Sequence, residues 1–139
     1  MPIASSLIMP SYAFYYCTAL SSIDWLSSCY PGLVSLPNYA FAYCQGVKSL
    51  SSLPSRVMAL GGFVFYYCTG LTGIQDLRNT SLTSLYNNNV FRYCSNVTEW
   101  KLPSTLTGTY FGSYVFANNT KLSAIELPAS LTAIASYCF

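Results

Sequence analysis

The sequence predicts a mainly β solenoid built from about five stacked repeats of 23 to 27 residues. Phenylalanines recur at that spacing, at Phe14, Phe41, Phe65, Phe91, Phe116 and Phe139. A cysteine follows three residues after each of the first four, at Cys17, Cys44, Cys68 and Cys94, and Asn119 takes this place after Phe116. A fixed period in this range indicates stacked units, because a single unit of this size cannot bury its own apolar face.

The domain prediction is one solenoid over residues 1–139, since 53% hydrophobic residues exclude a disordered chain. The pattern begins in mid-repeat around Leu7-Ile8 and Tyr12-Ala13, and it stops at Phe139 in the same phase. No capping repeat is apparent at either end. We therefore expect a segment of a longer protein, or a subunit whose apolar ends associate with those of other copies.

Composition excludes several classes of function. The 10 charged residues give a net charge of +2 without a basic stripe, so nucleic acid is not an expected partner. Residues 57–75 are uncharged, but their glycines and repeat phase argue against a membrane span. The N-terminus lacks the basic start of a signal peptide. With no histidine, no CxxC pair and no base beside a nucleophile, we expect no metal, no cofactor and no catalytic residue.

The six cysteines allow two interpretations. In a small secreted protein they would suggest a disulfide framework. Four of them, however, occupy one column of the repeat and should point inward beside the phenylalanines, where a thiol behaves as a small apolar group. We favour buried free thiols over disulfides.

Each repeat is expected to have two short strands. Residues 122–127 end in an Ile-Glu-Leu alternation, which predicts a strand with Ile125 and Leu127 inward, and Pro128 ends it. Residues 130–134 predict a second strand on the opposite wall. The corner around each Phe is expected to be a helical or tight turn. At the same spacing, the other repeats place Ile23, Leu50, Ile74 and Trp100 in the inward position of Ile125. On the second wall, Thr109 stands in repeat four where the pattern expects an aliphatic residue.

This arrangement resembles the BspA-like leucine-rich repeat, whose unit reads F-x-x-C-x-x-L-x-x-I-x-L-P-x-x-L-x-x-I-x-x-x-A-F. The matching residues are Phe65, Cys68, Leu71, Ile74 and Leu77, and then Phe116, Leu122, Ile125, Leu127, Pro128, Leu131 and Ile134. The resemblance implies a right-handed leucine-rich-repeat solenoid with parallel strands. It also implies an extracellular or cell-surface protein of the kind linked to adhesion in bacteria and protozoan parasites.

Outward positions of the first strand form one candidate binding face. We assign to it Asp24, Ser51, Gln75, Lys101 and Glu126, beside a second row of Ser22, Ser49, Gly73, Glu99 and Ala124. In solenoids this face commonly lines the binding surface. Because these side chains are small and polar with no repeated charge, a solvated face without a ligand is an equally good interpretation.

Aromatic columns on either side of each Phe form a second candidate, a tyrosine-rich edge. One column holds Tyr16, Tyr43, Tyr67 and Tyr93, with Asn118 in the fifth repeat, and the other holds Tyr12, Tyr39, Phe63, Tyr114 and Tyr137, with Asn89 as the exception. One interpretation is that the rings only stabilise neighbouring coils by packing. Alternatively, they form a ledge for a sugar or protein, since tyrosine combines apolar area with a hydroxyl.

Three glycosylation sequons begin at Asn79, Asn96 and Asn118, and in a chain this rich in Ser, Thr and Asn they can arise by chance. The leading hypothesis for function is a non-catalytic adhesion module that recognises a protein or glycan through the strand face or the tyrosine edge. The alternative is a structural repeat segment or filament subunit that extends or polymerises end to end.

Overall fold

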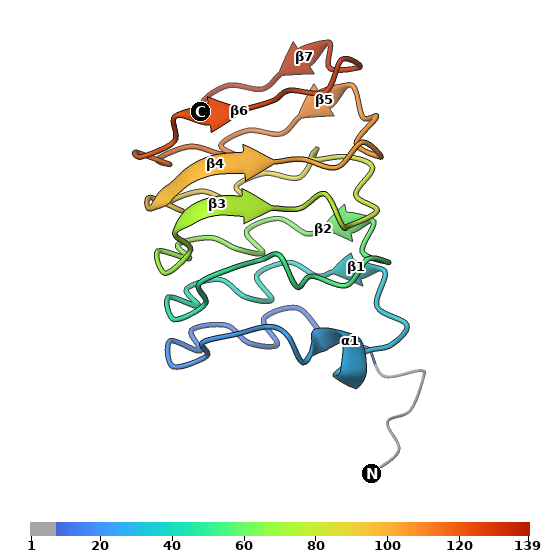
Figure 1. The fold of residues 1–139 in the computed structure, drawn as a ribbon, viewed down its shortest axis with the longest axis vertical. Helices are drawn as coiled ribbons and strands as arrows, with labels where there is room; N and C mark the ends of the chain where they lie inside the picture. Colours follow the sequence, from blue (N-terminus) through green and yellow to red (C-terminus); the bar gives the residue numbers. More distant parts are fainter. Residues whose placement is uncertain (1–7) are drawn as a thin grey trace.

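Short strands and one helical turn lie at successive levels of a vertical stack in the computed structural model, which describes residues 8–139 (Figure 1). We number five coils from the Phe at which each begins, namely Phe14, Phe41, Phe65, Phe91 and Phe116. The apolar position expected at Leu7 and most of the N-terminal stretch assessed for a signal peptide lie outside the described residues. In residues 8–139 no helix is long and apolar enough to cross a membrane.

The strands lie on two walls, and all of their pairings are parallel, as the sequence predicts. The first wall carries a sheet of three strands in the order β3 (Gly73–Asp76), β4 (Val97–Lys101), β6 (Ala124–Ile125). The second wall carries two pairs, β1 (Ser35–Leu36) with β2 (Ala59–Leu60) and β5 (Tyr110–Phe111) with β7 (Ala133–Ile134). One helical turn, α1 (Leu26–Cys29), lies in coil one.

The corner around each Phe is a pair of tight turns with an unusual backbone. The residues two before and two after each Phe have φ near +60°, as Tyr39 (58°) and Tyr43 (61°) show. Their amides, and that of the Phe between them, donate to carbonyl oxygens of the next coil: Tyr39 to Gly62 at 3.0 Å, Phe41 to Val64 at 3.0 Å and Tyr43 to Tyr66 at 2.7 Å. The corner therefore joins successive coils without forming a regular strand.

The phenylalanine column forms the centre of the core. Phe41, Phe65, Phe91 and Phe116 are buried and stack on one another with ring centroids 5.6 to 5.9 Å apart. The inward placement predicted for this column is confirmed for these four. Phe14 is half-buried, whereas Phe139 stacks on Phe116 but is 52% exposed.

The predicted register of coil three is wrong by one residue. Ile74, expected inward, is 54% exposed, and Gln75, expected on the outward face, is 1% exposed. Gln75 lies ten positions after Phe65, whereas the matching Trp100 lies nine after Phe91. The strand pairing has a bulge between Gly73 and Ile74, and the φ of +67° at Gly73 favours glycine there. Consequently Gln75 pairs with the buried Trp100, and Ile74 pairs with Glu99.

The buried amide of Gln75 is fully hydrogen-bonded. Its Oε1 accepts from the Leu50 amide at 2.8 Å, and its Nε2 donates to the carbonyl oxygens of Lys48 at 3.2 Å and Thr72 at 3.0 Å. On this wall the sheet begins only at β3. The side chain thus supplies hydrogen bonds between coils two and three where a strand ladder is missing.

Two further apolar positions differ from expectation. In coil four the second-wall column continues at Phe111, which pairs with Ile134, because two extra residues separate it from the position occupied by Thr109. In coil five Leu127, expected inward, is 41% exposed and lines a groove.

Replacing Phe91 with alanine should lower the free energy of unfolding by about 3 to 5 kcal/mol, because the ring is fully buried between two others. Phe139→Ala, in the same column but half exposed, should cost only about 1 kcal/mol. Urea denaturation followed by circular dichroism measures both. Equal losses of unfolding free energy in the two variants would contradict the difference in burial between Phe91 and Phe139.

The corrected register predicts that Gln75→Leu lowers the free energy of unfolding by about 2 to 4 kcal/mol, since one buried amide and two carbonyl groups lose their partner. Ile74→Gln should change it by less than about 0.5 kcal/mol, because that side chain faces solvent. Chemical denaturation of the two variants decides the point, and the opposite order would restore the register expected from spacing.

Candidate functional site

Of the ten outward residues assigned to the strand face, four lie on or directly after β4 and β6, namely Glu99, Lys101, Ala124 and Glu126. Lys101 and Glu126 flank the buried row as expected, and Glu99 pairs with Ala124 across the two strands. Gln75 and Gly73 do not belong to this face, because the bulge turns Gln75 into the core and puts Ile74 and Asp76 in the outward positions. Asp24 and Ser51 lie exposed in coils one and two, outside the three-stranded sheet.

Half of the charged residues of the chain gather beside this sheet. Asp76 and Arg78 form a salt bridge of 2.8 Å, and a second hydrogen bond joins Asp76 Oδ1 to Arg78 Nε at 2.9 Å. Hydrogen bonds from Arg78 lower the pKa of Asp76 to about 2. With Glu99, Lys101 and Glu126 they make five of the ten charged side chains. Sequence reasoning missed this cluster because the bulge hid the position of Asp76.

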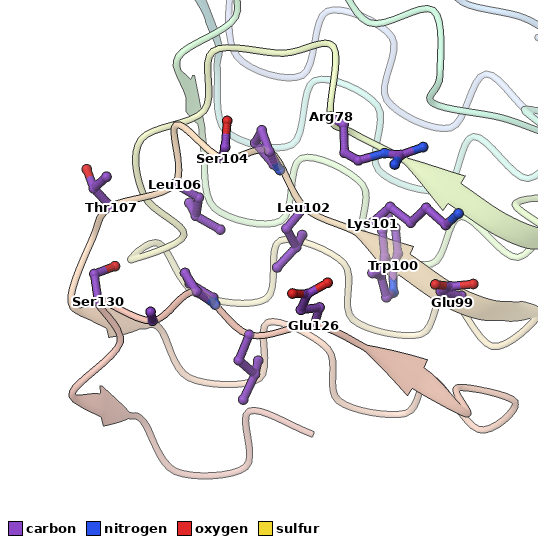
Figure 2. A pocket seen from close by; sticks show the side chains of 14 residues that line it. Arg78, Glu99, Trp100, Lys101, Leu102, Ser104, Leu106, Thr107, Glu126 and Ser130 are labelled. Atoms are coloured by element: carbon purple, nitrogen blue, oxygen red, sulfur yellow. The ribbon is translucent and has the colours of Figure 1, made fainter.

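A groove of about 730 Å³ opens between coils four and five next to these charges (Figure 2). Arg78, Lys101 and Glu99 lie at its strand end, and Thr107 and Ser130 at the opposite end. Its apolar lining comes from Trp100, Leu102, Pro103, Leu106, Leu127 and Pro128. Prolines lack the amide needed for bonding between coils, and coil four has two extra residues before Phe111.

The tyrosine edge is a close-packed lattice of rings. Tyr12, Tyr39 and Phe63 stack at 4.6 Å with interplanar angles of 5° and 6°. Tyr16, Tyr43, Tyr67 and Tyr93 follow one another at 4.4 to 5.3 Å, and Tyr114 stacks on Tyr137 at 5.1 Å. The structure therefore brings the predicted edge residues together in columns, with Asn89 separating Phe63 from Tyr114.

Two further tyrosines, which sequence reasoning did not single out, fill the space between the columns. Tyr15 and Tyr66 stand nearly perpendicular to Tyr43, at 84° and 78°. Burial among these rings raises the pKa of Tyr39 and of Tyr43. Inside each column the ring faces are covered by their neighbours, so little face area is left there on which a sugar could stack, whereas Tyr12, Tyr16 and Tyr137 at the column ends are more than half exposed. The packing role proposed for this edge is thus well supported by the geometry.

The cysteine column is a ladder of hydrogen bonds. Cys44, Cys68 and Cys94 each donate from Sγ to the carbonyl oxygen of the Phe in the preceding coil, at 3.1 to 3.4 Å. Asn119 does the same from Nδ2 to Phe91 at 2.8 Å, and its Oδ1 accepts from the Trp100 indole at 2.9 Å. Asn119, the exception in the cysteine column, therefore also provides a hydrogen-bond acceptor for the indole N–H of the buried Trp100. All six cysteines are free thiols in the structure.

The sequon asparagines differ in their surroundings. Asn79 is exposed, whereas Nδ2 of Asn96, the atom to which a glycan would be attached, donates to Thr69 at 2.8 Å. Asn118 Oδ1 accepts from Arg92 at 3.3 Å. Their use as glycosylation sites stays a prediction. Among residues 8–139, no three side chains of the types that ligate metals come together.

Stacked coils with parallel strands on two walls and a Phe corner define a solenoid of the leucine-rich-repeat class. A model of the BspA type leucine rich repeat region matches residues 7–139 in six copies, so the chain belongs to that family. The phenylalanine spacing had predicted about five repeats.

The crystal structure of the T. pallidum leucine-rich repeat protein has the same fold, with a TM-score of 0.64 and 19% sequence identity. The match covers 89% of this chain and 64% of that protein, so the present chain corresponds to part of its length. No protein with curated functional information matches the chain.

The rate at which each cysteine reacts with a thiol reagent should follow the exposure of its side chain in the structure. With a thiol-reactive dye at pH 8, exposed Cys17 should react first and half-buried Cys29 more slowly, while Cys44, Cys68, Cys94 and Cys138 stay protected until the chain unfolds. Rapid reaction of all six in the folded protein would contradict the burial of this column.

The same thiols should make stability depend on alkaline pH. Burial raises the pKa of Cys44 and of Cys138 from 9.0 to about 11, so the folded state holds these protons more tightly than the unfolded state. The free energy of unfolding should therefore fall as the pH rises from about 9 to about 11. Urea titrations across this range measure the effect.

Proposed function

We propose that this chain is a non-catalytic binding module of a cell-surface protein and that it holds a protein ligand in the groove beside β3, β4 and β6. The observation that carries the proposal is the coincidence of two features. Five of the ten charges of the chain and a groove with apolar lining occupy the same place. Charges elsewhere in the chain are spread thinly over the coils.

The composition of the groove suits a protein partner. Leucine and proline side chains offer an apolar floor for an anchoring side chain, and both signs of charge at one end can orient a partner of mixed charge. A polyanion would instead need several unpaired cations, but Arg78 is paired with Asp76 here, and Lys101 lies near Glu99 and Glu126. Of the two candidate faces, the strand face has the stronger support.

Cell-surface location, adhesion and end-to-end assembly stay predictions. They rest on the family to which the chain belongs and on the sequence pattern, and proteins of this repeat class commonly serve binding or structural roles.

Binding is tested by passing the chain over an immobilised panel of purified extracellular-matrix and plasma proteins, with biolayer interferometry as the readout. Leu127→Asp places a charge in the apolar lining and should weaken any binding found by about tenfold or more. Met58→Asp is the matched control, because Met58 is similarly exposed, at 47%, but lies away from the groove in coil two.

The proposal fails if both variants weaken binding equally, if Leu127→Asp has no effect, or if no protein of the panel binds. Lys101→Glu gives an independent readout. It should change the association rate and its dependence on salt more than the dissociation rate, because the lysine lies at the rim of the groove.

A further inference from the structure

The two asparagine exceptions of the aromatic columns meet an arginine at one point of the tyrosine edge. Asn89 replaces the aromatic residue two before Phe91, and Asn118 replaces the one two after Phe116. Arg92, between the two columns, occupies the position that Tyr15 and Tyr66 fill in coils one and three. Arg92 and two asparagines in otherwise aromatic columns, at the corners of Phe91 and Phe116, thus build one polar cluster within an aromatic lattice.

The cluster holds the guanidinium of Arg92 in a fixed position. Nε donates to Asn118 Oδ1 at 3.3 Å, and Nη1 donates to Asn89 Oδ1 at 3.2 Å. The guanidinium also lies over the rings of Tyr93 and Tyr114, with its carbon 5.0 and 4.4 Å from their centroids. Both asparagines have φ of +60°, a conformation that asparagine adopts more readily than most residues. The backbone conformation of the corner therefore favours asparagine at the two positions that hold Arg92.

Arg92 has unused binding capacity. A guanidinium carries five N–H groups, and two of them are engaged by the asparagines. Within residues 8–139 it forms no salt bridge, whereas Arg78 on the other face is paired with a carboxylate. No other charged residue belongs to the edge columns. A preorganised, half-buried and unpaired arginine is a site for an anion.

The single unpaired cation of the cluster is matched best by a ligand with one negative charge. A phosphate monoester carries close to two negative charges, and a polyanion many more, while this edge offers one cation. A carboxylate matches the planar fork of the guanidinium with two parallel hydrogen bonds. We propose that Arg92, with Asn89, Asn118 and the flanking tyrosines, binds the carboxylate of an acidic saccharide.

A saccharide fits these surroundings better than a peptide does. Phenol hydroxyls and asparagine amides both donate and accept hydrogen bonds, as the hydroxyls of a sugar require. A peptide would need an apolar cavity for an anchoring side chain, and the groove that offers one lies beside the strand sheet. The ring faces of the lattice are covered by their neighbours, so recognition rests on the arginine and on polar groups. This site does not depend on the groove or its partner.

The matched probes are methyl β-glucuronide and methyl β-glucoside, which differ only in a carboxylate and a hydroxymethyl group. Titration of the folded chain, followed by the NMR signal of Arg92 Nε–Hε, should show the glucuronide binding about tenfold tighter or more. Arg92→Gln should abolish this preference, and Arg92→Lys should keep only part of it. Arg56→Gln, an exposed arginine in coil two, should leave it unchanged.

Several results would overturn the proposal. Equal binding of the two glycosides, or a preference that survives in Arg92→Gln, would exclude a carboxylate site at Arg92. Acetate or acetyl-glutamate binding as tightly as the glucuronide would exclude the saccharide as the specific ligand. Thermal unfolding of each variant shows whether it is folded. Should Arg92→Gln unfold, the Arg92→Lys variant and the signal of the unaltered chain still decide between these outcomes.

Discussion

Every other feature of the stack depends on the backbone of the Phe corner. Residues in the left-handed conformation on both sides of each Phe turn three amides toward the next coil. Each such non-glycine residue costs about 1 to 2 kcal/mol. A cross-coil hydrogen bond, at about 0.5 to 1.5 kcal/mol, and a stacked aromatic pair, at about 0.5 to 1.5 kcal/mol, offset that cost. Tyrosine is favoured there because its ring can stack on the same position of the next coil.

The repeat, its parallel strands and its inward phenylalanines could be predicted because identical units must present the same side chains to the core. The register of coil three could not, because a single residue at Gly73 shifts the alternation and no spacing rule signals a bulge. Because Gln75 is polar and its expected position faced water, the residue type gave no indication of the register shift. Two of the three hydrogen bonds that compensate its burial go to backbone groups of coil two, which are far from Gln75 in the sequence.

The candidate sites were predictable to different degrees. The tyrosine columns follow from the period and were found, whereas the charge cluster required the corrected position of Asp76. The groove has a signal in the sequence, namely the two Leu-Pro pairs and the extra residues before Phe111. The asparagine exceptions were visible as irregularities. Their structural role could not be predicted, because it depends on backbone φ values and on contacts between coils, as the hydrogen bonds of Arg92 and Asn119 show.

The place of Gln75 also governs how the stack can deform. Above it, the strand wall is a continuous hydrogen-bonded sheet across coils three to five, while below it one amide side chain contributes to the join between coils two and three. Backbone hydrogen bonding along the strand wall is therefore regular across coils three to five, where the groove lies, and is supplemented by a side chain between coils two and three, while the Phe corner continues through both parts. A change that weakens the Gln75 contacts should thus loosen the join between coils two and three before it affects the groove beside β4.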